Sequence, residues 1–340
     1  MSLDTSFDIK NIICIFLYDL KDTINLYNLN KDHQNNIIII NLYDIPLKYT
    51  NKLNQQIIEQ NKYKYVKKLY AFDNKKIKNV NHIKNTLKIL NCSNESKIDQ
   101  NSILELNLIE LNADGNREIK NVNHMKETLK ILDCRDDSGI DQDGIAELNL
   151  IKLCARDNVK IKSVIHMKKT LKILDCCGDY CGIDQNGISE LNLIELDTWG
   201  NKKISNINHM KKTLKILNCG GNNCGIDQNG IGELNLIELD ASSNKKIRNV
   251  NHMKKTLKKL SCCYGSEIDQ NGISQLNLIE LSADGNEKIN NVNHMNKTLR
   301  VLNCGYESGI DQNGISELNL IELDAHKNNK IKYSIEKVEL

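Results

Sequence analysis

Cysteine and histidine recur together along this sequence, and both side chains can ligate metals or act in catalysis. Cys219 and Cys224 lie five residues apart, and His252 follows 28 residues after Cys224. Such a trio could hold zinc or supply a thiolate and a base. Neither this pair of cysteines nor Cys176 with Cys181 recurs with histidines at the spacing that a zinc module needs. The sequence therefore favours a structural role for these residues.

These residues belong to motifs that recur every 42 or 43 residues. The histidine motif is found at His82, His124, His166, His209, His252 and His294. An Ile-Asp-Gln motif begins at Ile98, Ile140, Ile183, Ile226, Ile268 and Ile310. Self-similarity at such a period indicates an array of stacked units, because one unit of this size cannot bury its own apolar face.

Each period contains two half-units of about 21 residues, about thirteen from Val66 onward. One half has the pattern L-x-x-L-x-C and the other has L-x-x-L-x-A-x-x-N, as in Leu214, Leu217 and Cys219, then Leu236, Leu239, Ala241 and Asn244. A three-residue step followed by a two-residue step predicts a turn that enters a short strand.

Period, apolar spacing and asparagine together resemble the leucine-rich repeat, whose unit carries L-x-x-L-x-L-x-x-N/C-x-L. The resemblance covers residues 66–331. It implies an α/β leucine-rich-repeat solenoid with a curved parallel sheet on its concave face and short helices or turns on its convex face, beside a small N-terminal helical segment. Cysteine here takes an apolar strand position, unlike the bend position usual in the cysteine-containing repeats of this family.

The repeated cysteines alternate with alanine in the same slot, which predicts small buried residues of the core. They are Cys92, Cys134, Cys176, Cys219, Cys262 and Cys304. Asparagine at the fixed place after the strand can bond backbone groups that a tight bend leaves unpaired. The cysteine half has Glu95 or Asp137 there, so its bend must be made differently. We expect the histidines to pack or to form hydrogen bonds on the outer side, and we expect no cofactor and no metal.

Binding should use the variable strand positions of the concave face, where acidic columns alternate with isoleucines. We interpret this band as a surface for a basic, partly apolar protein segment; the alternative is that duplication has merely copied a solvated face. Trp199 interrupts the pattern and could anchor a contact. The predicted target-binding residues are Glu110, Glu195, Asp197, Trp199, Glu238, Asp240, Glu280 and Glu322.

Residues 1–35 do not repeat, and their apolar spacing resembles an F-box without its Leu-Pro opening. The resemblance implies that these residues bind the Skp adaptor of a cullin-type ubiquitin ligase: Ile12, Ile15, Phe16, Leu20, Ile24 and Leu26. Residues 36–65 are then a linker and N-terminal cap, and residues 66–340 are the array. The repeated phrases IDQNGISELNLIEL and HMKKTLKIL of the array resemble the F-box and leucine-rich-repeat proteins of giant amoebal DNA viruses, which implies a role in host cytoplasm.

Composition narrows the remaining choices. Lys and Arg number 46 against 44 Asp and Glu among 340 residues, which indicates neither a nucleic acid nor an anionic membrane as partner. The apolar run from Ile12 to Leu17 is too short to cross a bilayer. We therefore expect a non-catalytic, cytoplasmic adaptor for host proteins. The alternatives are a free-standing binding protein whose N-terminus is only a cap and, further away, an enzyme or metal protein that uses the cysteines.

Overall fold

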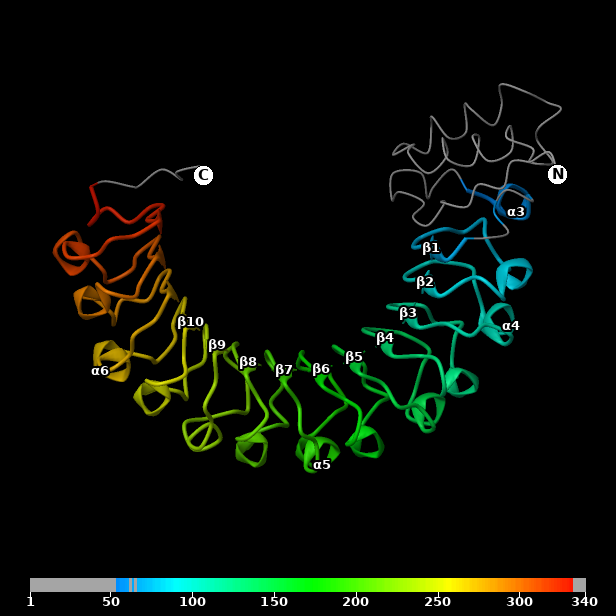
Figure 1. The fold of residues 1–340 in the computed structure, drawn as a ribbon, viewed down its shortest axis with the longest axis horizontal. Coiled ribbons are helices and arrows are strands. Elements are labelled where there is room, and N and C mark those ends of the chain that lie inside the picture. Colours follow the sequence, from blue (N-terminus) through cyan, green and yellow to red (C-terminus); the bar gives the residue numbers. More distant parts are fainter. Residues whose placement is uncertain (1–52, 61–62, 64–65, 333–340) are drawn as a thin grey trace, which may run out of the picture. The chain divides into compact units, whose positions relative to one another are not determined.

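The computed structural model describes residues 53–60, 63 and 66–332. The chain divides into two compact units, the first ending at Cys154 and the second beginning at Ala155. The six F-box-like residues lie outside the described residues, so the domain boundaries at residues 35 and 65 stay a prediction. In each unit, strands line one side of the coils and short helices line the other (Figure 1).

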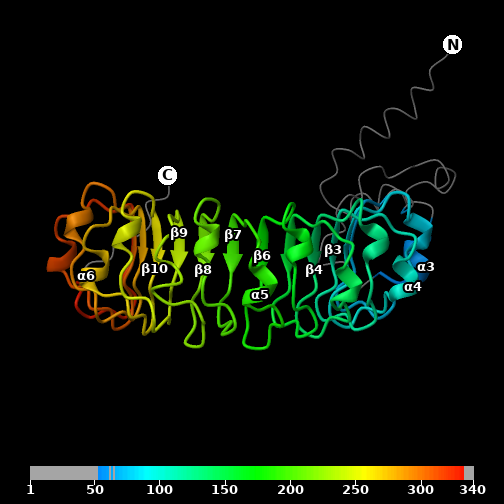
Figure 2. The same ribbon diagram turned by 90° about the horizontal axis from the view of Figure 1, so that it is seen from below.

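Every strand is three residues long and pairs in parallel with the next strand of its unit. The strands of the first unit are β1 (Lys68–Tyr70), β2 (Ile89–Asn91), β3 (Glu110–Asn112), β4 (Ile131–Asp133) and β5 (Lys152–Cys154). Those of the second unit are β6 (Ile173–Asp175), β7 (Glu195–Asp197), β8 (Ile216–Asn218), β9 (Glu238–Asp240), β10 (Lys259–Ser261), β11 (Glu280–Ser282), β12 (Val301–Asn303) and β13 (Glu322–Asp324). Figure 2 shows the arrows of β7, β8 and β9 pointing the same way.

The outer side is built from single helical turns. The α-helical turns are α3 (Gln55–Ile58), α4 (Gln100–Ile103), α5 (Gln185–Ile188) and α6 (Gln270–Ile273). The 3-10 turns are η4 (Asn81–Ile83), η5 (Asn123–Met125), η6 (Asp143–Ile145), η7 (Ile165–Met167), η8 (Asn208–Met210), η9 (Asn251–Met253), η10 (Asn293–Met295) and η11 (Asn313–Ile315). Asp184 caps α5, because its Oδ1 accepts the Gly187 N–H at 2.9 Å. Asn54 caps α3 in the same way, so this outer motif already begins at Leu53.

The core runs between strands and outer turns as stacked layers of equivalent side chains. Leu239 in the middle of β9, the neighbouring Ala241, and Met253 of η9 are at most 1% exposed. All six repeated cysteines are fully buried, which confirms their predicted place in the core. These cysteines lie just past the strand. The same position holds alanine or threonine in the alternate half, so it accepts only small side chains.

The repeated asparagines close the bends after the strands, as the sequence predicts. Asn244 is 1% exposed, and its Nδ2 donates to the carbonyl oxygens of Cys219 and Ile226 at 2.8 and 3.1 Å. Its Oδ1 accepts the N–H groups of Lys246 and Ile247 at 2.8 and 3.2 Å. One side chain therefore satisfies four backbone groups that the bend leaves without partners.

In the cysteine half a buried hydroxyl or thiol closes the bend. This residue lies later in the chain than the position that aligns with the repeated asparagine. Ser96, Ser138, Ser266 and Ser308 are at most 3% exposed, and Cys181 and Cys224 take this place in the two coils with longer turns. Ser266 Oγ accepts the Ile268 N–H at 3.4 Å.

Further side chains connect successive coils along the outer side. Gln228 Oε1 accepts the N–H groups of Arg248 and Asn249 at 3.0 and 2.9 Å, and its Nε2 donates to Asn249 O at 2.8 Å. His252 Nε2 donates to Ile231 O at 3.2 Å. The described residues thus confirm the predicted leucine-rich-repeat solenoid. None of their helices is long and apolar enough to cross a bilayer.

Candidate protein-interaction surface

The first and third residues of each strand face away from the core, because side chains alternate along a strand. In β9 the middle Leu239 is buried, whereas Glu238 and Asp240 are partly exposed. Every strand has this alternation, and in β10 the first residue, Lys259, is exposed. Two columns of side chains therefore follow the strand face in each unit.

The first column combines acidic and apolar side chains. In the second unit it consists of Ile173, Glu195, Ile216, Glu238, Lys259, Glu280, Val301 and Glu322. Only Lys259 is basic, and its Nζ lies 3.0 Å from a carboxylate oxygen of Glu280. In the first unit Glu110 lies between Ile89 and Ile131, and the end strands carry lysine at this position. The acidic band is therefore a feature of the second unit.

The second column, formed by the third residue of each strand, is mostly acidic or amidic because its side chains close the turn after the strand. Asp197 Oδ1 accepts the Trp199 N–H at 2.9 Å, and Asp240 Oδ1 accepts the Ser242 N–H at 2.9 Å. This bond to the residue two positions later is an Asx turn. Asp197 Oδ2 also accepts from Asn218 Nδ2 at 3.1 Å. Two residues predicted to bind a target thus have a structural task as well.

The strand ends around β7 form a site of concentrated negative charge. Burial raises the pKa of Asp197 above its usual value, and the neighbouring carboxylates of Asp175 and Asp240 act in the same direction. The hydrogen bonds from Trp199 and Asn218 oppose these effects. A cationic group placed beside these carboxylates would relieve their mutual repulsion.

A third column, just before the strands, was missed in the sequence. It alternates isoleucine in the asparagine half with lysine or arginine in the cysteine half: Lys172, Ile194, Lys215, Ile237, Lys258, Ile279, Arg300 and Ile321. Ile237 is 47% exposed, although its N–H is bonded to Lys215 O at 2.8 Å. The signal was the repeated isoleucine of the phrase Asn-Leu-Ile-Glu-Leu, at a position where the core needs no apolar residue.

Trp199 lies in the turn after β7 and not on the strand face itself. Its side chain is 39% exposed and lies against the neighbouring turn, where a Cβ on Gly220 would come within 2.3 Å of the indole Cζ3. Around it is an open hollow of about 480 Å³ that is also lined by Asp157, Asp179 and Tyr180. The structure therefore brings Trp199 next to Asp197 but at the edge of the predicted surface.

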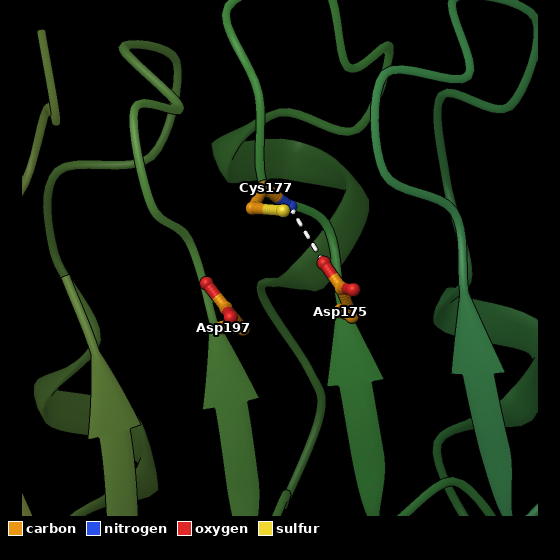
Figure 3. A group of neighbouring side chains, drawn as sticks. All are labelled: Asp175, Cys177 and Asp197. Atoms are coloured by element: carbon orange, nitrogen blue, oxygen red, sulfur yellow. Dashed lines mark hydrogen bonds between the residues drawn. The ribbon is translucent and has the colours of Figure 1, made fainter. Parts of the chain in front are cut away.

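Asp175, Cys177 and Asp197 are close enough to share a metal ion, since their ligand atoms lie within 4.8 Å of one another (Figure 3). Asp175 Oδ1 already accepts the Cys177 N–H at 3.1 Å, as the dashed line shows. Burial raises the pKa of the Cys177 thiol well above its ordinary value, and the nearby Asp175 carboxylate raises it further. Asp175 therefore closes the turn after β6, as Asp197 closes the turn after β7.

Cys219, Cys224 and His252 lie in different parts of the fold. Cys219 is fully buried in the core, whereas Cys224 is in the buried bend slot with its Sγ 3.9 Å from Thr198 Oγ1. His252 lies on the outer side in η9 and donates to Ile231 O. Each residue fills a position that is repeated in other coils, which is what a structural repeat requires.

No family model and no curated protein matches this chain. Solved structures of similar fold include the Rad7 and Elc1 complex in yeast, with 16% identity, a TM-score of 0.42, and coverage of 88% of this chain and 98% of that one. Internalin inlF of Listeria monocytogenes has 15% identity, a TM-score of 0.41 and coverage of 86% of each chain. The functional domain of InlJ from Listeria monocytogenes, described as including a cysteine ladder, has 17% identity, a TM-score of 0.39 and coverage of 77% of this chain and 59% of that one.

Proposed function

We propose that this protein is a non-catalytic interaction module whose strand face in the second unit binds a basic, partly apolar protein segment. One observation carries the proposal: the first and third strand positions of β6 to β13 hold eight acidic residues and one lysine. Ile173, Ile216 and Val301 separate the glutamates in the same column. A basic segment with apolar side chains complements this surface in both charge and hydrophobicity.

The histidines of the outer side and the cysteines of the core favour binding over catalysis. Five histidines point Nε2 at a carbonyl oxygen of the preceding outer turn: His82, His124, His209, His252 and His294. Burial raises the pKa of Cys92 and of Cys304 to about 12, so both thiols are protonated at neutral pH. Such groups serve the fold, because a nucleophile must be reactive and within reach of a base.

Charge reversal on the strand face tests the proposal. In the full chain, Glu195→Lys with Glu238→Lys should weaken binding of a library of Lys, Arg and Leu peptides at least 10-fold and flatten its salt dependence. The control is Glu190→Lys with Glu233→Lys, which changes the net charge equally at outer residues that pair with Lys168 and Lys211. We expect less than a 2-fold change in the control. Equal losses in both variants would show that only net charge matters, as a merely copied face would predict.

We further propose that residues 1–35 connect this module to a Skp adaptor, so that the bound protein is presented to a cullin-type ubiquitin ligase in host cytoplasm. The support is the F-box-like spacing of Ile12, Ile15, Phe16, Leu20, Ile24 and Leu26. The second candidate function is a free-standing binder in which the same segment only covers the first coil. That reading is favoured by the outer motif that begins at Leu53, which continues the array toward the segment.

Point variants in the full chain separate these two functions. Phe16→Asp or Leu26→Asp should abolish Skp binding and leave peptide binding by the strand face unchanged. Point variants are preferable to truncation at residue 66, because α3 belongs to the first coil and Asn74 Nδ2 donates to Leu53 O at 3.2 Å. If Skp binds both variants as tightly as it binds the natural chain, or if it binds none of these proteins, the free-standing binder is the function that remains.

A further inference from the structure

All aromatic residues of the second unit's described part lie in the turns that follow strands. Between residues 155 and 332 the only Phe, Tyr or Trp residues are Tyr180, Trp199, Tyr264 and Tyr306. They are 74%, 39%, 49% and 41% exposed, respectively. Large aromatic side chains usually add to a core or to an interface. Here the core of this unit is entirely aliphatic and sulfur-containing, and the aromatic surface is left for contacts with something else.

Around Trp199 the array departs from its own repeat on both sides. The turns that begin at Cys176 and Cys219 reach their buried slots at Cys181 and Cys224 after five residues, whereas Cys92 reaches Ser96 after four. Asn223 Nδ2 of the second longer turn donates to Asp179 Oδ2 of the first at 3.0 Å. The two insertions therefore form the walls of the hollow in which the indole lies.

The indole is held in place by the backbone beneath it. A side chain at Gly220 would collide with the ring, and a Cβ on Gly221 would lie 3.2 Å from the indole Nε1. In the other cysteine halves the place of Gly220 is taken by Ser93, Arg135, Cys177, Cys263 or Gly305. The combination of Trp199 with Gly220 makes a fixed aromatic surface, which loses little side-chain entropy when a ligand binds.

The polar groups of the hollow are suited to a cation. Asp179 has one carboxylate oxygen bonded to Asn223, and its other oxygen is directed toward Gly200. Asp157 accepts the Tyr180 N–H at 3.1 Å and has Arg156 Nε at 3.7 Å. The acidic strand ends at Asp175 and Asp197 lie directly beside this turn, so the local charge is negative. Phosphate groups would be repelled here, whereas a cation would be attracted both to the carboxylates and to the aromatic rings.

The same rim offers an intramolecular example of this pairing. Lys327 places its Nζ 5.5 Å from the centre of the Tyr306 ring, which also contacts the Tyr264 ring at 5.6 Å. Tyr264 and Tyr306 have φ angles of 40° and 54°, at a turn position that holds Gly178, Gly200 and Gly221 in other coils. A bulky residue in this conformation costs about 1 kcal/mol or more. Aromatic residues are therefore kept on this rim although the backbone disfavours them.

We propose that the hollow formed by Asp157, Asp179, Tyr180 and Trp199 takes an arginine or lysine side chain of a protein partner. This inference rests on the proposed function, since the same basic segment would cross from the strand face to the rim. The cationic head lies over the indole and beside the Asp179 carboxylate, and its aliphatic stem covers the Tyr180 ring. Arginine fits best, because its planar guanidinium can stack on the indole while it donates to a carboxylate.

Trp199 itself reports on occupancy, because it is the only tryptophan in the chain. The probe is a twelve-residue peptide that alternates arginine with serine, added to the full chain while the indole emission is measured. Glutamate-serine peptide and a neutral hexasaccharide serve as comparison ligands. We expect a saturable change in emission with the arginine peptide alone, and an apparent Kd that rises with salt.

Matched variants assign the effect to the hollow. Asp179→Asn should weaken arginine-peptide binding at least 10-fold, and Tyr180→Ala should weaken it several-fold. Glu307→Gln removes an exposed carboxylate at the same turn position of a later coil and should have less than a 2-fold effect. No saturable change, equal effects of Asp179→Asn and Glu307→Gln, or a response to the hexasaccharide in place of the arginine peptide would each overturn the proposal.

Comparing the strand-face variant with Asp179→Asn separates this inference from the proposed function. If Glu195→Lys with Glu238→Lys abolishes peptide binding but Asp179→Asn has no effect, the strand face binds and the hollow does not. If Asp179→Asn abolishes the Trp199 response and the strand-face variant has no effect, the hollow binds cations by itself and the proposed function fails. Loss in both cases supports one continuous surface.

Discussion

Replacing Asn244 by alanine should remove a large part of the stability of one coil. The side chain makes four hydrogen bonds to backbone groups at distances from 2.8 to 3.2 Å, and it is 1% exposed. Each bond contributes about 1 kcal/mol net, so we expect Asn244→Ala to lower the free energy of unfolding by about 4 kcal/mol, within a range of about 2 to 6. Two carbonyls and two N–H groups would remain buried without partners.

Urea unfolding, followed by far-UV circular dichroism and by Trp199 fluorescence, measures this loss. Trp199 is in a turn of the preceding asparagine half, so its emission reports on the neighbourhood of the altered coil. Asn222→Ala is the matched control, because Asn222 is exposed in the adjacent turn and should change stability by less than about 0.5 kcal/mol. Asn244→Asp keeps an acceptor for Lys246 and Ile247 but places an oxygen against two carbonyls, so it should destabilise at least as much as alanine at pH 7.

The bonding account would be refuted by a loss below about 1 kcal/mol for Asn244→Ala, or by equal losses for Asn222→Ala and Asn244→Ala. A loss seen by fluorescence but not by circular dichroism would locate the effect in a few coils. That result is compatible with the account, because each coil of a solenoid contacts only its neighbours.

Three further predictions follow from buried and partly buried groups. Cys219→Ala should cost no more than about 2 kcal/mol in urea unfolding, because alanine fills the same slot in alternate coils, and a larger loss would contradict simple core packing. The thiols of Cys92 and Cys304 should react with a disulfide reagent only in urea, because burial raises the pKa of each to about 12 and the thiolate is the reactive form. Burial lowers the pKa of His124 and His252, so the unfolded chain takes up their protons first as pH falls. The stability that these two histidines contribute is therefore complete above about pH 6.5 and is lost below it. The urea concentration at the unfolding midpoint should decrease when the pH is lowered from 7.5 to 5.5, and His252→Gln should make that decrease smaller.

Much of the fold was predictable because each feature recurs in register. Leu239 and Asn244 have counterparts in every second half-unit at fixed offsets, and the place of Ala241 holds alanine in all of these except at Thr198, so the strand, core and bend positions follow from spacing alone. The buried position of the repeated cysteines was predictable for the same reason, since cysteine and alanine alternate at this position along the array, as Cys219 and Ala241 do. Repetition reveals which positions must fit a neighbouring copy.

The bend of the cysteine half was less accessible. Counting three residues from Cys92 leads to Glu95, but the buried residue is Ser96, because this turn contains one more residue. Its left-handed residue is Asn94, with a φ of 57°. An alignment that assumes equal turn lengths therefore compares an exposed side chain with a buried one.

The acidic third strand position has two roles that sequence could not separate. The sequence alone does not distinguish an aspartate that accepts the N–H two residues later from an aspartate whose carboxylate is available to a binding partner. The structure assigns one oxygen of Asp197 and of Asp240 to the turn, so replacing either residue would alter both the turn and the surface charge. Glu195 and Glu238 at the first position are therefore the better residues for testing binding.

Near-identical coils make the irregular positions the most informative ones. Side chains that recur in every coil are explained by the contacts that each copy makes with the next, as Asn244 and Gln228 show. Such contacts do not require a tryptophan, a longer turn or a glycine beneath an indole. Trp199 and the two insertions depart from the repeat together and meet at one hollow, although they come from three successive turns. Independent drift of the copies would scatter such departures along the array, so their convergence favours a binding function at this edge.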